Sequence, residues 1–426
     1  MKDTLVDGLR PLIGIALVLC ITFLASEDRR SVSGRDLIRG VLFQFFLALL
    51  LLKVSLFQRA FEFLNQGVLA VQAATRAGTS TVFGYLGGGL SPFEITAPEH
   101  VFILGIQALP MILVFSALSA VLYYWQILPK LVGLFAWVLG RLFKIGGACS
   151  FATVATVFVG MVEAPLLINP YLKNLTRTEL LIVMSSGMAT LSGTVLVLYA
   201  SFLQNVVPGA IGHLLVGSII SAPVSVMLSL VVVPLVQKPH DLDPKAIKLQ
   251  LHYHGLMDAI STGTVQGLKL LANVLAMLIV LIALVALANS FLSLLPSWGA
   301  TPISLQRVVG VVMQPLAWSL GVDWADTAAA GQLLGTKLVL NEFLAYLDFS
   351  TLPLEAMSDK SRVLMTYLLC GFANFGSLGI VIAGVGAMAP SRRDEIISLG
   401  GRALLVGTLS TCLSSADAAL ILYGLK

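Results

Sequence analysis

Long apolar runs separated by short polar segments dominate this chain of 426 residues. Windows of about 20 apolar residues, the length needed to cross a bilayer, predict eight transmembrane helices. They lie near residues 11–26, 38–57, 101–125, 178–204, 210–237, 267–296, 361–389 and 396–423. The pattern therefore predicts an all-α integral membrane protein.

Three further apolar regions are interrupted by polar residues and are predicted to differ from full spans. Region 58–95 is amphipathic, with Arg59 and Arg76 among apolar residues, which favours an interfacial helix. Regions 146–172 and 325–350 are too polar or too short to cross once. Each is predicted to form a re-entrant hairpin that enters and leaves on the same side, buried in protein.

The composition agrees with a membrane protein that has little mass outside the bilayer. Hydrophobic residues make up 57% of the chain and charged residues 11%, whereas a soluble domain has about 25% charged residues. The net charge of +4 comes from loop arginines and lysines and does not indicate nucleic-acid binding. The four cysteines show no metal spacing, and no hydrolase, metalloprotease or phosphate-loop motif indicates an enzyme.

Loop arginines predict the orientation, because positive residues resist translocation. The link between the first two predicted spans contains Arg29, Arg30, Arg35 and Arg39, and the link between the last two contains Arg392 and Arg393. Both links are predicted to be cytoplasmic. With eight spans, both termini would then lie on the periplasmic side of a bacterial inner membrane.

The segment at residues 366–382 is membrane-length but contains Asn374, Gly376, Ser377 and Gly379. Hydrocarbon cannot satisfy an amide or freed backbone groups, so this part must face protein or a water-filled cavity. The hairpin before it places Glu342 among apolar residues. Broken helices beside short hairpins are typical of a secondary transporter's substrate site.

A short internal repeat indicates two related halves. GMATLSGTVL at 187–196 aligns with GFANFGSLGI at 371–380, pairing Thr190 with Asn374. Each copy follows a hairpin with one glutamate, Glu163 or Glu342. We therefore predict an inverted repeat, 146–204 and 325–389, with a binding site between the halves. The core would comprise residues 101–426, and residues 1–100 an amino-terminal scaffold of two spans and the interfacial helix.

Six segments resemble the concentrative nucleoside transporter family. They are TVFGYLGG (81–88), FVGMVEAPLLINPYLKNLTRTEL (158–180), GMATLSGTVLVLYA (187–200), MDAISTGTVQGLKLLANVLAMLI (257–279), GTKLVLNEFLAY (335–346) and CGFANFGSLGI (370–380). The resemblance covers nearly the whole chain, and the combination of EAPL, NEF and GFANFGS is highly specific. It implies a homotrimer in which each protomer has eight spans, two re-entrant hairpins and its own transport path. The implied function is import of nucleosides, driven by a cation gradient.

The resemblance also implies roles for individual residues. Glu342, Asn374 and Ser377 match residues that hold the ribose, Phe372 matches a residue of the same pocket, and Glu163 matches one beside the nucleobase. This chemistry is reasonable, because a carboxylate accepts from two hydroxyls while an amide and a hydroxyl supply further donors and acceptors.

Two departures from the family pattern affect base preference and coupling. Met161 and Val162 stand where many members have a glutamine and a threonine, and with Thr194 and Val195 they resemble purine-preferring relatives. A thioether packs against a bicyclic base without requiring a hydrogen bond. The family's sodium site would comprise the hydroxyls of Thr156 and Thr190 and the carbonyls of Val159 and Leu191. The usual asparagine ligand is missing, so sodium and the proton both stay open as coupling ions.

Two other function classes fit the same residues. An uncoupled nucleoside facilitator or channel could use the same polar path. An intramembrane enzyme could use Glu163 and Glu342 as an acid and base pair. No cofactor other than the coupling ion is predicted. Lys337 and Asp417, also in apolar segments, are interpreted as structural.

Overall fold

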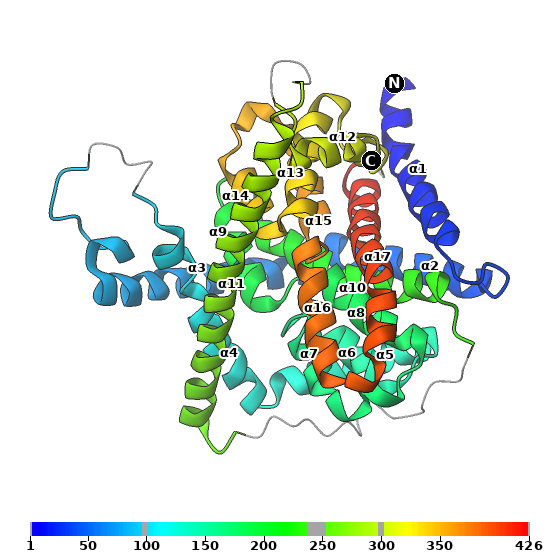
Figure 1. The fold of residues 1–426 in the computed structure, drawn as a ribbon, viewed down its shortest axis with the longest axis horizontal. Coiled ribbons are helices and arrows are strands. Elements are labelled where there is room, and N and C mark those ends of the chain that lie inside the picture. The colour runs from blue at the N-terminus through cyan, green and yellow to red at the C-terminus, as the bar shows by residue number, and fades with distance from the viewer. Residues whose placement is uncertain (1, 96–100, 237–252, 297–301, 425–426) are drawn as a thin grey trace.

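The computed structural model describes residues 2–95, 101–236, 253–296 and 302–424, and every regular element in these ranges is helical (Figure 1). This confirms the predicted all-α class. The helices are α1 (Lys2–Leu24), α2 (Gly34–Lys53), α3 (Ser55–Phe83), α4 (Met111–Tyr124), α5 (Ile127–Phe143), α6 (Gly147–Ala155), α7 (Glu163–Leu167), α8 (Arg177–Ala189), α9 (Gly193–Leu203), α10 (Ala210–Val232), α11 (Leu256–Leu292), α12 (Leu305–Ser319), α13 (Thr327–Val339), α14 (Glu342–Thr351), α15 (Asp359–Leu369), α16 (Phe375–Met388) and α17 (Arg393–Ala419).

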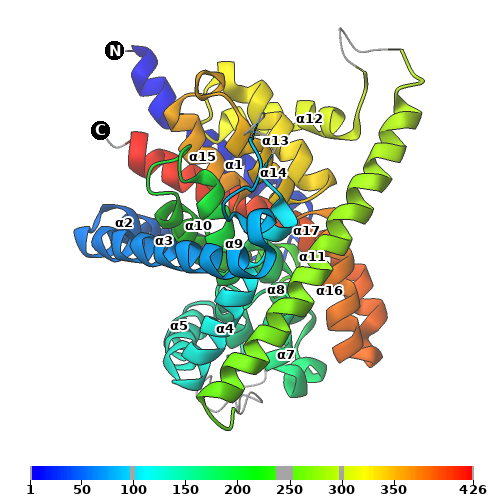
Figure 2. The same ribbon diagram turned by 90° about the vertical axis from the view of Figure 1, so that its left-hand side faces the viewer.

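Five helical segments of the described chain are long and apolar enough to cross a membrane. They are Leu104–Tyr124, Arg177–Leu203, Ala210–Val232, Leu256–Leu292 and Pro390–Gly424. Helix α2 counts as a sixth only together with α3, to which it is joined at a bend of 66°. The other two predicted spans correspond to α1, whose apolar part is short, and to the interrupted pair α15 and α16. In Figure 2, α3 runs across the direction of α11.

Helices α8, α10 and α17 form the buried centre of the protein. Apart from charged residues in the first turns of α8 and α17, and Arg402 and Asp417 of α17, their sequences are mostly apolar or small, which is the pattern of a helix surrounded by other helices. Pairs of serines join them by hydrogen bonds: Ser185 to Ser229 at 2.8 Å, and Ser221 to Ser414 at 2.8 Å. Small polar residues of this kind allow helices inside a membrane to pack closely and to form hydrogen bonds with each other.

Two helical hairpins occupy the regions that the sequence marked as re-entrant. Helices α6 and α7 form the first, α13 and α14 the second, and they lie toward opposite ends of the molecule (Figure 1). Each is followed by an interrupted helix, α8/α9 with a break after Ala189 and α15/α16 with a break after Leu369. The breaks touch, because a Cβ atom at Gly371 would lie 2.9 Å from the carbonyl oxygens of Met188 and Ala189.

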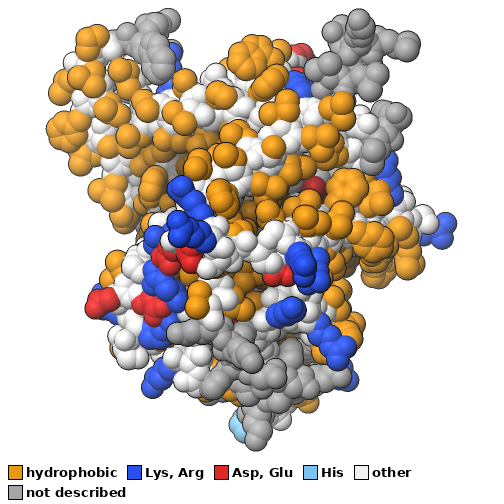
Figure 3. All heavy atoms as spheres, turned by 90° about the vertical axis from the view of Figure 1, so that its right-hand side faces the viewer, with side chains coloured by type: hydrophobic (Ala, Val, Ile, Leu, Met, Phe, Trp, Pro, Cys, Tyr) orange, Lys and Arg blue, Asp and Glu red, His pale blue; other side chains and the backbone are white. Residues whose placement is uncertain are grey.

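The two arginine-rich links lie on the same side of the protein. Glu27, in the first link, pairs with Arg177 at 2.7 Å and with Arg402 of α17 at 3.2 Å. In the second link Arg392 pairs with Glu395 at 2.7 Å. Figure 3 shows charged side chains gathered in the lower part of one face, with a hydrophobic surface above. Both termini lie at the opposite end (Figure 1).

Two helices, α5 and α12, were not predicted. Helix α5 buries one face at spacings of three and four residues, from Leu128 to Phe143, as an amphipathic helix does. Helix α12 packs against α13, with Gly310 and Gly331 in backbone contact. At 17 and 15 residues, both are shorter than the window that detects membrane spans.

Candidate functional site

A cavity of about 560 Å³ lies between the two hairpins and their interrupted helices. Its walls come from the α6–α7 turn and from α9, α11, α14 and α16. The structure brings all eight predicted substrate residues to this cavity: Met161, Val162, Glu163, Val195, Glu342, Phe372, Asn374 and Ser377. Residues separated by more than 200 positions in sequence therefore share one space.

Glu342 is the most constrained acid in this cavity. It is the first residue of α14, and the side chain of Asn341 caps that helix by accepting from the Leu344 N–H at 2.9 Å. Oε1 of Glu342 accepts from the Tyr199 hydroxyl at 2.8 Å, and Oε2 accepts from the Asn374 amide at 2.8 Å. With a donor on each oxygen the carboxylate has a fixed orientation, and lone pairs remain for further donors.

Asn374 has two functions at the break before α16. Its Oδ1 caps the helix by accepting from the Ser377 N–H at 2.7 Å. Because Oδ1 faces that N–H, Nδ2 points the other way and donates to Glu342 and to the Phe372 carbonyl at 3.2 Å. The amide of Asn374, which would be costly in hydrocarbon, thus has hydrogen-bond partners in the backbone of the break and in Glu342.

Tyr199 of α9 is the main site residue that sequence reasoning missed. Its ring stacks on Tyr346 of α14, with centroids 4.6 Å apart, while its hydroxyl reaches Glu342. The helical period could have identified it, because Tyr199 follows the predicted residue Val195 by four positions and therefore lies on the same face of α9. The donor to Glu342 thus comes from the first interrupted helix, whereas Glu342 itself belongs to the second hairpin.

Glu163 begins α7 as Glu342 begins α14, and its side chain is exposed to the cavity. The turn before it requires glycine at position 160, where φ is +127° and a Cβ atom would lie 2.6 Å from Oε2 of Glu163. Met161 and Val162 complete the turn and pack closely against Gly187 and Gly384. They give this part of the cavity an apolar wall.

The four predicted sodium ligands belong to the α6–α7 turn and to the α8–α9 break. The two segments are joined, because the Gly193 N–H donates to the Phe158 carbonyl at 3.1 Å. Thr156 and Thr190 are buried, and their hydroxyls donate to the carbonyls of Thr153 at 2.7 Å and Ser186 at 2.9 Å. Since each hydroxyl hydrogen is engaged, the lone pairs of each oxygen are available to a cation.

The two carbonyl groups of that set differ in their surroundings. The Leu191 carbonyl accepts from the Ser218 hydroxyl at 3.2 Å, whereas Val159 lies at the cavity wall. All four are neutral hard oxygens, the type of ligand that sodium needs. Within the described residues, no three His, Cys, Asp or Glu side chains form a group that could hold a metal ion.

Lys337 and Asp417 are buried but do not line this cavity. Lys337 donates to the Leu368 carbonyl at 2.7 Å and so ties α13 to the end of α15. These contacts support its structural interpretation. The carboxylate of Asp417 has no hydrogen-bond partner of normal geometry among the described residues, and the side chain of Gln44 beside it has none either. Asp417 therefore lacks the well-formed hydrogen bonds that a structural acid would have.

Comparison with known proteins identifies the family. Models of the Na⁺-dependent nucleoside transporter match residues 13–86 (N-terminus) and 213–419 (C-terminus), and a nucleoside recognition model matches residues 105–205. The nucleoside permease NupC of Helicobacter pylori is 30% identical over 98% of this chain and 98% of its own length. This chain belongs to the concentrative nucleoside transporter family. The family consists of transporters and not enzymes, as the sequence predicted.

Other relatives extend the similarity over the whole fold. An uncharacterised transporter of Haemophilus influenzae is 34% identical over 97% of this chain and 98% of the relative. The solved structure of CNTnw in an inward-facing substrate-bound state superposes with a TM-score of 0.85 at 32% identity, covering 97% of this chain and 98% of that one. The helical membrane fold of the transporter family is therefore the fold of this protein.

Proposed function

We propose that this transporter is a symporter that imports nucleosides, using a cation gradient. The observation that supports this most directly is Glu342, held between Tyr199 and Asn374 in a cavity lined by both hairpins and both interrupted helices. A site between two inverted units is suited to alternating access, because each hairpin can open it toward a different side. An uncoupled nucleoside facilitator is the competing function.

In this proposal Glu342, Asn374 and Ser377 hold the ribose, with Phe372 beside it. Glu342 accepts from ribose hydroxyls with its remaining lone pairs, and charge-assisted bonds of this kind contribute about 1.5–3 kcal/mol each. Glu342→Gln should nearly abolish uptake in a protein that still inserts and folds, and free uracil should compete poorly with uridine. Normal uptake by Glu342→Gln, or equal inhibition by uracil and uridine, would contradict the assignment.

The base is proposed to lie against Glu163, Met161, Val162 and Val195. The apolar wall at Met161 and Val162 provides packing surface for a large base and no hydrogen bond to a pyrimidine edge. We therefore propose that purine nucleosides are favoured.

Sodium is the proposed coupling ion, bound by the hydroxyls of Thr156 and Thr190 and the carbonyls of Val159 and Leu191. The family model supports sodium dependence, and the proton is the alternative. The deciding experiment is uptake into proteoliposomes with sodium and proton gradients imposed separately. Concentrative uptake driven by sodium alone supports the proposal, and uptake driven by the proton alone would replace sodium. If the nucleoside only reaches equal concentrations inside and outside under both gradients, the protein is a facilitator.

The proposed setting is a bacterial inner membrane, with eight spans, both termini periplasmic and three identical protomers. The positions of the arginine links, at the end opposite the termini, support the orientation. Residues 1–100 would form the scaffold and residues 101–426 the core. Cross-linking and mass measurement of the purified transporter test the trimer, and labelling of single cysteines introduced near each terminus tests the orientation.

A further inference from the structure

Lys269 lies deep within α11 and is not used by the site described above. At a rise of 1.5 Å per residue it is about 20 Å from the start of the helix. Its neighbours on α11 are largely apolar and exposed on the protein surface, as expected for a helix that faces lipid. Lys269 is the third residue of the predicted span 267–296, and a lysine that lines a cavity among apolar neighbours is a candidate functional residue.

A second cavity of about 480 Å³ lies in front of Lys269. It adjoins the substrate cavity, and the two share the lining residues Val159, Glu163, Leu270 and Asn273. Along α11, Gln266, Lys269 and Asn273 line it at spacings of three and four residues, so they form one polar face. Lys269 thus lies in the second cavity, next to the shared residue Leu270.

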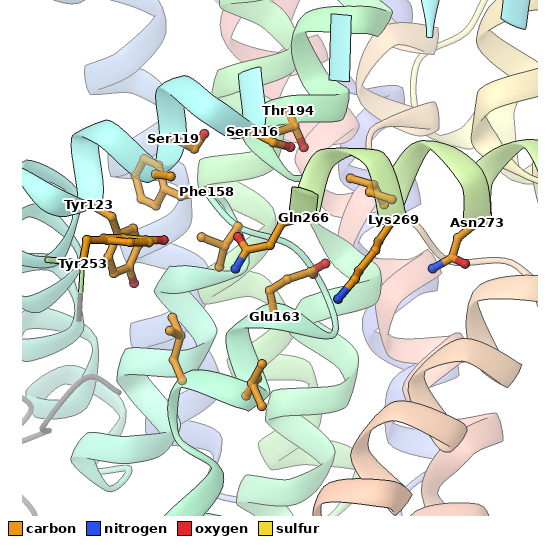
Figure 4. Close-up of a pocket in the computed structure, with 15 residues that line it drawn as sticks. Ser116, Ser119, Tyr123, Phe158, Glu163, Thr194, Tyr253, Gln266, Lys269 and Asn273 are labelled. Carbon is orange, nitrogen blue, oxygen red and sulfur yellow. The ribbon is translucent and has the colours of Figure 1, made fainter. Parts of the chain in front are cut away.

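Glu163 projects into the same space from the opposite wall. Figure 4 shows the side chains of Glu163 and Lys269 extending toward each other. Both side chains are exposed to the cavity, yet they form no ion pair within 4.0 Å, and Lys269 has no other polar partner among the described residues. Two opposite charges therefore face each other across a gap that water or a ligand can fill.

Helix α11 is closely packed next to Lys269. Helix α11 packs on α4 through Gly263 and Gly267, where Cβ atoms would lie 2.7 Å from Ala120 and 2.8 Å from Ser116. Such close contact between small residues fixes one helix on another. Glu163 lies directly after the glycine turn of the first hairpin. The backbone at Lys269 is therefore held in place, and the flexible stem of the lysine side chain allows the two charges to approach each other.

We propose that Lys269 is the internal counterion of Glu163 in the empty transporter. This inference rests on the proposed symport. After nucleoside and coupling cation have left, Glu163 pairs with Lys269, and the neutral pair allows the empty site to return across the membrane. Without the pair, the return step would move a bare carboxylate through a low-dielectric environment, which is unfavourable. Entry of the coupling cation separates the pair again.

The test separates net uptake from exchange, because only net uptake requires the empty site to return. In proteoliposomes, Lys269→Met and Lys269→Gln should lower sodium-driven net uptake of adenosine at least tenfold. Exchange of labelled adenosine against internal unlabelled adenosine should stay within about twofold of the wild type. Lys269→Arg should retain both activities. Lys130→Met, which removes a lysine from an exposed position of α5, is the matched control and should leave the ratio of net uptake to exchange unchanged.

Two results would overturn the proposal. Equal loss of net uptake and exchange in Lys269→Met and Lys269→Gln would assign the lysine to binding or folding. If neither activity falls, Lys269 has no role as a counterion. The partner is tested in a Glu163→Gln background, where Lys269→Met should produce no further fall in the ratio. A further fall there would exclude Glu163 as the partner. If the wild type shows no concentrative uptake under either gradient, the symport itself fails, which is a separate outcome.

Discussion

The hydroxyl of Tyr199 donates to Oε1 of Glu342 across 2.8 Å and joins the first interrupted helix to the second hairpin. The two residues lie 143 positions apart in sequence. Asn374, from the second interrupted helix, occupies the other oxygen of the same carboxylate. A change at any of these three positions should therefore affect how the acid is presented to substrate.

Tyr199→Phe is expected to raise the KM for nucleosides more than it lowers the maximal rate. The variant retains the ring that stacks on Tyr346 and loses only the donor that orients Glu342. A hydrogen bond to a charged group contributes about 1.5–3 kcal/mol, so a rise of one to two powers of ten is the upper limit. Uptake kinetics in proteoliposomes provide the measurement.

Tyr346→Phe is the matched control for that variant. It removes a buried tyrosine hydroxyl from the stacked partner ring, but this hydroxyl donates to the Thr366 carbonyl and not to Glu342. Its KM should stay close to that of the wild type. An equal rise in KM for both variants would show that ring packing, and not the donor to Glu342, determines affinity.

The double variant Met161→Gln, Val162→Thr should raise the ratio of uridine uptake to adenosine uptake. It supplies hydrogen-bonding groups on a wall of the cavity that is now apolar. One or two new hydrogen bonds correspond to about 1–3 kcal/mol, or one to two powers of ten in the ratio. Uptake of both nucleosides is measured side by side. An unchanged ratio would mean that this turn does not contact the base.

Thr156→Val should weaken activation by sodium about tenfold, which corresponds to about 1.4 kcal/mol, and should leave the pH dependence of uptake unchanged. The change removes one of the four proposed ligands. Thr153→Val, three residues earlier in the buried α6, is the control, because its hydroxyl donates to the Cys149 carbonyl and it is not a proposed ligand. Full uptake by the wild type without sodium, increasing as the external pH falls, would instead favour the proton.

Gly160→Ala should severely reduce uptake. At φ +127° an alanine is strained by about 1–3 kcal/mol, and its methyl group would displace the carboxylate of Glu163. Gly379→Ala is the control, because a Cβ atom there meets nothing within 4 Å. Both variants are measured for uptake and for the amount of folded protein in the membrane. Normal uptake by Gly160→Ala would show that the turn tolerates another backbone conformation.

Low pH should weaken the ion pair between Glu27, in the loop that connects α1 and α2, and Arg177 of α8. The hydrogen bond from Arg177 holds the pKa of Glu27 below its ordinary value of 4.5, against a smaller opposing effect of burial. A carboxyl whose pKa is lowered by folding stabilises the protein above its unfolded pKa. That contribution is lost as the pH falls through the lower folded value.

The melting temperature in detergent, measured from pH 7 to pH 3, should therefore fall less steeply for Glu27→Gln than for the wild type. Asp36→Asn, which breaks an exposed pair with Arg39, should follow the wild-type curve. Identical curves for Glu27→Gln and the wild type would show that this ion pair does not contribute to stability.

The helical membrane class, the two hairpins and the acids within them could be predicted from the sequence alone. Apolar runs of membrane length predict helices, because hydrocarbon cannot form hydrogen bonds with an unpaired backbone. Glu163, Glu342 and Asn374 are conspicuous because polar side chains are costly inside a membrane. The repeat further indicated that the two glutamates are equivalent, and both do begin the second helix of their hairpins.

Which side chains contact each other could be seen only from the packing of the helices. Tyr199 reads as an ordinary aromatic residue of an apolar helix, and only packing of α9 against α14 brings its hydroxyl to Glu342. Lys269 likewise faces Glu163 across a cavity only because α11 lies opposite the first hairpin. Helices α5 and α12 escaped prediction because they are too short to span a membrane. Local pattern reports what each segment must bury, whereas contacts between distant segments depend on how the helices pack.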